Sequence, residues 1–301
     1  MLTSTVHDVA LVFEGGGMRA SYTAPVVEVL LEQGWYFDWV AGISAGSSNT
    51  VNYLSRDPAR ARASFTDFAG DPRLGNLGTF LQGKGLFAAE YIYEHTAGPD
   101  EALPFDFATF QANPARMRLG AFRCRDGQQV WFTKDDIHEL PDLMKRVRAS
   151  STMPCLMPPT AIGDEVYVDG ALGPTAGIPL QPALDEGFDR FFVVLTRPRD
   201  YRMEPYRVAP LFRAWWRKYP AVGEAMINRW RGYARVREML FDLERDGRAY
   251  VFAPTHMSVH NSTRNVPALR ASHAAGLAQA RRELPRWRDF LGLERPPRLA
   301  A

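Results

Sequence analysis

Two stretches near the start of the chain decide the fold. Residues 8–20 read DVALVFEGGGMRA, and residues 38–50 read DWVAGISAGSSNT. In each stretch a short apolar run ends at a glycine-containing turn. Such a run predicts a buried parallel strand, and the periodic residues that follow it, at 21–33 and 45–56, predict helices. Strand, helix, strand, helix with short loops is typical of a parallel sheet that is covered by helices on both faces.

The remaining chain extends this pattern without a repeat or a low-complexity linker. Asp126-Gly127 predicts a hairpin turn, and the three prolines of 154–159 (PCLMPP) exclude a helix there. Residues 71–86 predict a surface excursion because they carry few periodic apolar positions. Strands are predicted at 8–13, 38–43, 116–124, 128–133, 165–168, 190–196 and 249–253, and helices at 21–33, 45–56, 135–149, 205–248 and about 265–284. The expected fold class is α/β, with three α/β/α layers, a mainly parallel central sheet and a helical C-terminal part, in one domain over 1–301.

Composition excludes several classes of protein. The 301 residues are 46% hydrophobic, 23% charged and 12% aromatic, which excludes disordered, collagen-like and disulfide-stapled chains. No apolar run approaches the 18 or so residues of a membrane span, and no signal peptide is expected at the start. A net charge of +2 argues against a nucleic-acid partner. Two cysteines, Cys124 and Cys155, suit a reducing compartment, so we expect a cytoplasmic protein.

The first glycine-rich turn, Gly15 to Ala20 (GGGMRA), lies between a predicted strand and a predicted helix. Glycines there allow a tight turn that exposes several N–H groups at a helix start, which favours a negative group. The group bound is either the pyrophosphate of a cofactor or the oxyanion of acyl transfer. Alone, the motif also satisfies the dinucleotide fingerprint, or it is a tight turn without a ligand.

The second turn, Gly42 to Gly46 (GISAG), also joins a strand to a helix. A Gly-x-Ser-x-Gly elbow bends so sharply that the flanking residues must be small, and it exposes the serine hydroxyl at the carboxyl end of the strand. A dinucleotide fold would place an acid at the end of this second strand. Asp38 stands at the start of the predicted strand, whereas Ser44 stands at its end. The two turns together therefore favour hydrolysis over cofactor binding.

Two kinds of base could accept the Ser44 proton. A Ser-Asp/Glu-His order would use His256 or His260, in the loop after the last predicted strand. Asp169 follows another predicted strand and precedes Gly170. A carboxylate becomes an adequate base when it is partly desolvated and within direct hydrogen-bond reach of the hydroxyl. Because Asp-Gly is also a common turn dipeptide, spacing alone leaves the choice open.

The chain resembles the patatin-like phospholipases. Members of that family have a glycine-rich turn after the first strand, a Gly-x-Ser-x-Gly elbow roughly 25 residues on, and a later Asp-Gly-Gly or Asp-Gly-Ala. The corresponding stretches here are Gly15 to Ala20, Gly42 to Gly46 and Asp169 to Ala171, and residues 149–154 (ASSTMP) resemble the family's turn before the aspartate. The resemblance covers residues 8 to about 200, and the helical portion from about 201 to 301 is less diagnostic.

The resemblance implies a Ser-Asp dyad without histidine. Ser44 would be the nucleophile and Asp169 the proton acceptor, and the N–H groups of Gly15, Gly16 and Gly17 would form the oxyanion hole. The implied activity is hydrolysis of fatty-acyl esters of phospholipids, lysophospholipids or related lipids through an acyl-serine intermediate.

Other motif residues have supporting roles by the same resemblance: Arg19, Gly42, Gly46 and Gly170. Arg19 would orient the loop or favour an anionic substrate, with a structural salt bridge as the alternative. One departure is Ala20, where the family usually has glycine.

No cofactor is expected, and no His/Cys/Asp cluster with metal-ligand spacing is present in the sequence. The partner is a lipid ester substrate. The stretch 202–237 has nine basic residues (Arg or Lys) and only two acidic ones, and it also contains three tryptophans. It leaves open a peripheral contact with anionic membrane lipid, although a helical cap that packs on the sheet is the more ordinary interpretation. A dinucleotide- or anion-binding protein remains the alternative of another class, and the sequence leaves the oligomeric state undetermined.

Overall fold

The structure is a computed structural model that describes residues 2–83, 85–206 and 209–293. Residues 207–208 and 294–301 of the predicted helical C-terminal portion therefore lie outside the description. Every predicted strand is confirmed within a few residues, and one short strand, β5, was not predicted. The strands are β1 Ala10–Phe13, β2 Trp39–Ile43, β3 Arg116–Arg123, β4 Gln129–Phe132, β5 Thr160–Ile162, β6 Glu165–Asp169, β7 Phe191–Val194 and β8 Ala249–Phe252.

The strands form one mixed sheet of eight strands in the described part of the chain, in the order β5-β6-β3-β2-β1-β7-β8, with β4 also paired to β3. The five strands β3, β2, β1, β7 and β8 run parallel to one another. β4, β5 and β6 form antiparallel pairs. The predicted mainly parallel sheet is confirmed, with an antiparallel edge on the β3 side.

Strand β3 has three partners, and their register positions the candidate site. Its residues 119–120 pair with both β2 and β4, and its residues 121–122 pair with both β4 and β6. Because a strand has only two edges, β2 and β6 share the edge opposite β4. β2 ends at Ile43 opposite Gly120, and β6 ends at Asp169 opposite Ala121. The carboxyl ends of β2 and β6 therefore meet head to head.

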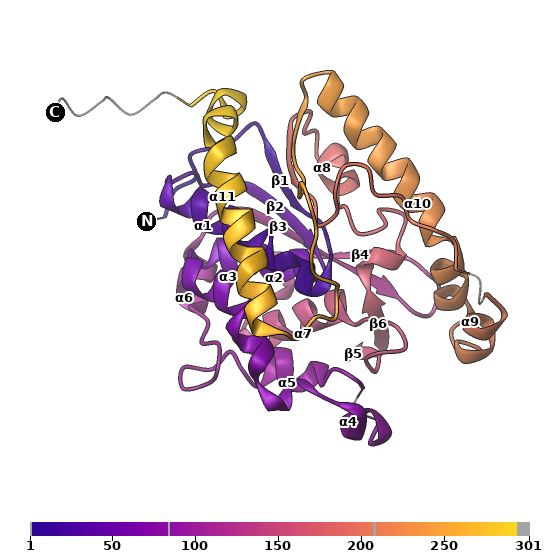
Figure 1. The fold of residues 1–301 in the computed structure, drawn as a ribbon. Coiled ribbons are helices and arrows are strands. Elements are labelled where there is room, and N and C mark those ends of the chain that lie inside the picture. The colour runs from indigo at the N-terminus through magenta and orange to yellow at the C-terminus, as the bar shows by residue number, and fades with distance from the viewer. Residues whose placement is uncertain (1, 84, 207–208, 294–301) are drawn as a thin grey trace, which may run out of the picture.

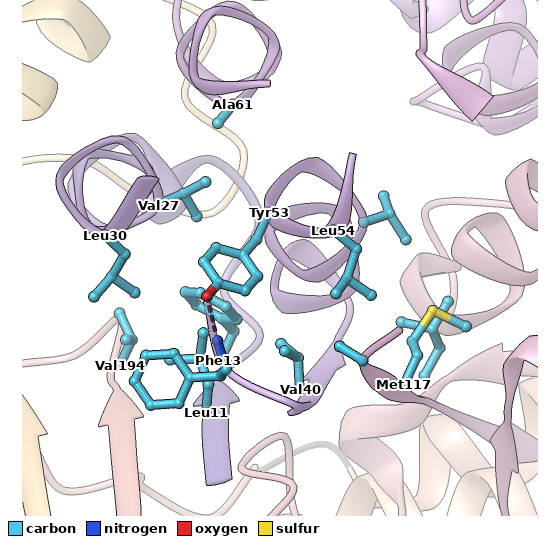
Figure 2. Close-up of a cluster of buried hydrophobic side chains, with 14 of the residues drawn as sticks. Leu11, Phe13, Val27, Leu30, Val40, Tyr53, Leu54, Ala61, Met117 and Val194 are labelled. Carbon is cyan, nitrogen blue, oxygen red and sulfur yellow. Dashed lines mark hydrogen bonds between the residues drawn. The ribbon is translucent and has the colours of Figure 1, made fainter. Parts of the chain in front are cut away.

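Helices cover both faces of the sheet (Figure 1). Alternate strand residues point to opposite faces, so the sheet divides two cores. Leu11, Phe13 and Val40 pack against α1, α2 and α11 on one face, and Figure 2 shows part of this cluster. Val12 and Ala41 pack against α10 on the other. The helices are α1 Ala24–Glu32, α2 Ala45–Leu54, α3 Pro58–Phe65, α4 Leu77–Leu81, α5 Ala89–Glu94, α6 Phe107–Ala112, α7 Leu140–Ser151, α8 Gln181–Asp185, α9 Ala209–Trp215, α10 Pro220–Arg245 and α11 Val266–Leu291.

Several helix boundaries differ from the predicted ones for local reasons. α7 begins at Leu140 rather than 135, because a 3₁₀ turn over Lys134–Asp136 precedes it and Glu139 with Asp142 forms its capping box. The predicted helix 205–248 is two helices, since Pro220 begins a new one in α10. No helix in the described ranges combines the length and apolarity that crossing a bilayer requires.

Candidate active site

Ser44 occupies a sharp turn between β2 and α2. Its backbone has φ 59° and ψ −127°, a conformation that residues other than glycine rarely adopt. The flanking glycines are required by close approaches: a Cβ on Gly42 would lie 2.1 Å from the Gly46 carbonyl oxygen, and one on Gly46 would lie 2.2 Å from the Phe13 carbonyl oxygen. The Ser47 hydroxyl donates a hydrogen bond to the Ser44 carbonyl at 2.6 Å. The Gly-x-Ser-x-Gly stretch thus has the strand-turn-helix geometry of a nucleophile elbow.

A second serine, Ser150 near the end of α7, holds this turn in place. Its hydroxyl accepts a hydrogen bond from the Ser44 N–H at 2.9 Å and donates one to the Gly120 carbonyl at 2.6 Å. Ser150 thereby ties the turn to β3. In the sequence, the 149–154 stretch shows only a family resemblance, and no pattern there predicts a role for this hydroxyl.

Asp169 is the last residue of β6 and lies at the junction with β2. Its Oδ1 accepts a hydrogen bond from the Ala171 N–H at 2.9 Å. Burial raises the pKa of Asp169 above its ordinary value, while the Ala171 N–H, the Ser44 hydroxyl and the positive charge of Arg229 oppose the shift. Gly170 follows in a tight turn, where a Cβ would lie 2.2 Å from the Gly120 carbonyl oxygen. Asp169 is a buried carboxylate beside the Ser44 hydroxyl.

The glycine loop differs from the predicted oxyanion hole at one position. The Gly15 N–H donates to the Gly177 carbonyl at 3.0 Å, so it is occupied. The N–H groups of Gly16 and Gly17 have no acceptor among the described residues. Gly17 has φ 55°, and a Cβ there would lie 2.4 Å from the Asn261 carbonyl oxygen. In this conformation the N–H groups of Gly16 and Gly17 are available to an oxyanion, whereas the Gly15 N–H is not.

Arg19 follows the glycine loop and lines the same cavity as Gly15, Gly16 and Gly17. It is 9% exposed, and its Nε has no hydrogen-bond partner in the described part of the chain. Burial and, second, the charge of Arg197 lower the pKa of Arg19 to about 10, although Glu14 opposes the shift. No salt bridge joins Arg19 to an acid among the described residues, so the salt-bridge alternative is not supported. Ala20 is buried in a small cluster with Ala24 and Phe65.

Two cavities meet at Ser44 and differ in character. The first is mainly apolar and runs between α2, α3, α5 and α7, with Val51, Phe65, Phe87 and Met157 among its lining residues. The second contains Gly15, Gly16, Gly17, Arg19, Asp169 and Arg229. Met153 lines both cavities, and Leu156 lines the second. The structure therefore brings together the predicted serine, aspartate and glycine loop between an apolar chamber and one of mixed lining that contains two arginines.

The other candidate residues lie elsewhere. His256 and His260 are exposed in the loop after β8, and neither lines a cavity at Ser44. Asp38 precedes β2 at the opposite end of that strand from Ser44 and lies 3.2 Å from His7 (Oδ2 to Nδ1). Neither a histidine base nor a ribose-binding acid is assembled at the turns.

Three further residues hold the glycine loop and the turn after Asp169, and none of them was predicted as a site residue. Thr196 donates through its Oγ1 to the Gly15 carbonyl at 2.7 Å. Tyr233 donates to Glu14 Oε1 at 2.7 Å, directly before the glycine loop. Arg229 donates through its Nε to the Ala171 carbonyl at 2.9 Å. No local pattern could have identified them, because each contact joins segments more than 50 residues apart.

Comparisons with known proteins place these features in context. A family model described as patatin-like phospholipase matches residues 11–184, which is more than half of the chain. A second model, a domain of unknown function designated DUF6363, matches residues 219–292. The prediction of one domain over 1–301 stays a prediction.

Two individual proteins are similar to this chain. The uncharacterized protein YjjU of Escherichia coli K12 is 25% identical over 199 residues, which cover 65% of this chain and 54% of YjjU. The chain thus spans about half the length of that relative. The crystal structure of VipD from Legionella pneumophila has a TM-score of 0.52 at 13% identity, covering 94% of this chain and 68% of VipD. At that identity the likeness concerns the fold alone.

Proposed function

Because the chain belongs to the patatin-like phospholipase family, we propose that it is a serine acyl hydrolase that cleaves fatty-acyl esters of phospholipids, lysophospholipids or related lipids. The observation that carries the proposal is the head-to-head junction of β2 and β6 on one edge of β3. This junction sets the Ser44 hydroxyl beside the buried carboxylate of Asp169. A hydroxyl next to a desolvated base is the minimal arrangement for nucleophilic acyl transfer.

The reaction proceeds in two stages. In the first, Ser44 Oγ attacks the ester carbonyl carbon as its proton passes to Asp169. The bond to the alcohol then breaks, and Asp169 returns the proton to the departing alcohol oxygen. In the second stage, water attacks the acyl-serine and gives its proton to Asp169. The bond to Ser44 Oγ breaks, the proton returns to that oxygen, and the fatty acid is released.

The oxyanion formed in each stage lies against the free N–H groups of Gly16 and Gly17. Fixed backbone donors stabilise this charge without reorganisation, and loss of one donor typically costs about 2.7–4 kcal/mol of activation free energy. Gly16 and Gly17, in the turn after β1, line the second cavity together with Ser44. No step requires a metal ion or an organic cofactor.

The two cavities at Ser44 suit the two parts of a lipid ester. The apolar chamber would take the acyl chain, because its lining is mostly aliphatic and aromatic. The second cavity would take the alcohol portion, and the positive charge of Arg19 there favours a phosphate-bearing group. We therefore expect acyl esters with an anionic alcohol portion to be better substrates than neutral ones.

We also propose a peripheral contact with membrane lipid. The large hydrophobic side chains exposed in the described part of the chain occur in two segments, α4 and 206–215; they are Phe80, Leu81, Tyr206, Leu211 and Trp215. We call these five residues the exposed apolar surface. The loop 153–157 contacts residues that follow each segment: the Leu156 carbonyl accepts a hydrogen bond from the Leu86 N–H at 2.8 Å, and Cys155 packs in one cluster with Trp216. The same loop lines both cavities, so a lipid surface here would face the site.

The proposal is tested with a fluorophosphonate probe, which phosphonylates an activated serine. We expect the modified peptide to contain Ser44 in the wild-type protein, no labelling of Ser44→Ala and at least a hundredfold slower labelling of Asp169→Asn. His256→Ala and His260→Ala are the matched controls and should label at the wild-type rate. Loss of labelling in either histidine variant would instead support the histidine-dependent esterase.

Two further outcomes would contradict the proposal. One is labelling of wild-type protein that persists in Ser44→Ala, because the nucleophile would then be another residue. The other is the absence of labelling together with saturable binding of NADPH, followed by its fluorescence, because the glycine loop would then serve a dinucleotide. Hydrolysis of lysophosphatidic acid, lysophosphatidylcholine and monoacylglycerol, compared at equal chain length, ranks the substrate classes.

A further inference from the structure

The C-terminal segment that matches the domain of unknown function, residues 219–292, contacts both loops of the candidate active site. It lies outside the part of the chain that matches the phospholipase family, residues 11–184. Among the contacts between the two parts, three reach these loops, through Arg229 and Tyr233 of α10 and Asn261 of the loop before α11. Each contact ends within a few residues of a proposed catalytic group.

The Arg229 contact fixes the turn that follows Asp169. Its Nε donates to the Ala171 carbonyl at 2.9 Å, and its Nη2 donates to the Ala176 carbonyl at 3.4 Å. A planar guanidinium that bridges two carbonyls holds them in a fixed relation. Because the Ala171 N–H itself bonds Asp169 Oδ1, the bridge extends to the carboxylate. Arg229 also brings a positive charge into the cavity that contains Asp169.

The Tyr233 contact fixes the start of the glycine loop. Its hydroxyl donates to Glu14 Oε1 at 2.7 Å, and the other Glu14 oxygen accepts from the Thr196 N–H at 2.5 Å. Glu14 is 4% exposed and Tyr233 is 2% exposed. A buried carboxylate that is bonded on both oxygens has little freedom to move. The fixed position of Glu14 therefore fixes the direction in which the chain continues from β1 into Gly15 and the rest of the glycine loop.

The Asn261 contact fixes the far side of the same loop. Its carbonyl accepts the Met18 N–H at 2.9 Å. It also lies so close to Gly17 that a Cβ there would be 2.4 Å from this oxygen. The Gly16 and Gly17 N–H groups are thus held between Glu14 on one side and Asn261 on the other. Tyr233 lies within α10, and Asn261 lies in the loop between β8 and α11.

We propose that the segment 219–292 is a structural part of the catalytic site, in which Arg229 positions the Asp169 turn while Tyr233 and Asn261 position the oxyanion-binding glycine loop. The inference rests on the proposed function, since it assigns positioning roles toward that reaction. It gives the segment a role that neither its family model nor the phospholipase match provides. The three residues are positioning residues, because they act through Asp169 and the glycine loop and have no assigned contact with the reacting atoms.

The two α10 residues predict different kinetic signatures. Arg229→Gln removes a charge that favours the ionised form of Asp169, so the pKa of Asp169 rises. Phosphonylation requires the ionised carboxylate, and its rate therefore falls at acid pH and recovers at higher pH. Tyr233→Phe removes a bond to Glu14 and leaves the charge at Asp169 unchanged. Its effect should be a lower rate at every pH.

The experiment measures the rate of fluorophosphonate labelling of the full chain as a function of pH. For Arg229→Gln we expect the acid midpoint to move upward by about one pH unit, which is a tenfold lower rate well below the midpoint. For Arg229→Lys, which keeps the charge, we expect a midpoint close to that of the wild type. For Tyr233→Phe we expect an unchanged midpoint and a plateau lower by about tenfold.

The matched control is Arg235→Gln, which makes the same change at an exposed position of α10 and should leave the profile unchanged. Melting temperatures verify that each variant is folded, and if Arg229→Gln is unfolded, Arg229→Met, which also removes the charge, replaces it with the same expected upward shift of the midpoint. An acid midpoint that Arg229→Gln leaves in place would overturn the role of Arg229. A plateau that Tyr233→Phe leaves unchanged would overturn the role of Tyr233. The proposed function fails separately, through wild-type protein that is not labelled at Ser44.

Discussion

The backbone at Ser44 has an unfavourable conformation that the surrounding structure imposes. At φ 59° and ψ −127° the Cβ of a residue other than glycine crowds its own backbone, at a cost of about 1–3 kcal/mol. Two hydrogen bonds hold Ser44 in this conformation. The Ser47 hydroxyl donates to the Ser44 carbonyl, and the Ser44 N–H donates to the Ser150 hydroxyl. The strain presents the hydroxyl to the cavity, so the proposed activity and the stability of the fold make opposite demands on this residue.

This conflict predicts that glycine is more stabilising than alanine at position 44. Ser44→Gly relieves the positive-φ strain, although glycine loses more chain entropy on folding than alanine does. Because the relief of strain is the larger effect, Ser44→Gly should be about 1 kcal/mol more stable than Ser44→Ala. Urea denaturation measures the difference. At Ser48, inside α2, the order should be reversed, because glycine weakens a helix interior. Equal stability of the two Ser44 variants would contradict the strain.

The Asp169 carboxylate predicts an unusual pH dependence of stability. Because burial raises its pKa in the folded state, the folded protein binds its proton more tightly than the unfolded chain does. Its contribution to stability is therefore fully present below the unfolded value of about 3.9 and is lost as pH rises through the folded value. Asp169→Asn should melt above the wild type at pH 7, and the difference should shrink as pH falls toward 4. A lower melting temperature for Asp169→Asn at pH 7 would disagree with this sign.

Individual residues differ in how far the sequence reveals them. Ser44 and Asp169 lie in short motifs whose geometry follows from neighbouring glycines, so the sequence could nominate them, although their roles stay predictions. Gly15 was expected to donate to the oxyanion, but its N–H bonds Gly177, a partner 162 residues away that no local pattern indicates. The roles of Arg229 and Tyr233 were equally hidden. Arg229 resembles the exposed arginines of a basic helix, and Tyr233 fits the helix's apolar periodicity, which predicts core packing and gives no sign of a bond to Glu14.

At the scale of elements, the site depends on how β2, β3 and β6 meet. β2 and β6 lie end to end, and α7 connects the junction to the rest of the fold through Ser150. Ser150 is fully buried, and its hydroxyl bonds both the Ser44 N–H and the Gly120 carbonyl. Removal of the hydroxyl would leave two buried backbone groups without partners, which is more costly than the loss of one exposed bond.

We therefore expect Ser150→Ala to lower the free energy of unfolding by about 1–3 kcal/mol and to slow labelling of Ser44. Ser55→Ala is the matched control, because the Ser55 hydroxyl bonds only a carbonyl three residues earlier. It should cost less and leave labelling unchanged. Chemical denaturation and labelling rates measure the two effects. A labelling rate in Ser150→Ala equal to that of Ser55→Ala would contradict the role of the hydroxyl.

The sequence predicts the elements better than it predicts their connections. Buried strands such as β1 and β7 are continuous apolar runs and were found within two residues. β5 was missed because its three residues are too few for a period. The antiparallel course of β6 depends on long-range pairing with β3, which a strand's own residues do not encode. The division of 205–248 into α9 and α10 reflects a single proline at the start of α10.

At the scale of the whole molecule, the charge and the exposed apolar residues are unevenly distributed. The net charge is only +2, yet residues 202–237 hold nine basic residues and two acidic ones. Most of α10's apolar side chains pack on the sheet, as the ordinary interpretation of this stretch predicts. On α9, however, Leu211 and Trp215 are each 60% exposed and one helical turn apart. Exposed Arg217 and Lys218 follow directly, which suits an anionic lipid surface.

This uneven distribution predicts that substitution of Trp215 separates hydrolysis of lipid in vesicles from hydrolysis of a soluble ester. Trp215→Asp places a carboxylate where the proposed contact inserts an indole, so binding to vesicles that contain anionic lipid should weaken about tenfold or more. Turnover of a short-chain nitrophenyl ester should be unchanged, because Trp215 lines neither cavity at Ser44. Co-sedimentation and the two hydrolysis rates measure the separation.

Ala278→Asp, on an exposed position of α11, adds the same charge away from the exposed apolar surface and should change neither rate. Equal vesicle binding by the two variants would show that lipid reaches Ser44 by another face, whereas a parallel loss of both activities in Trp215→Asp would place Trp215 in the support of the site itself.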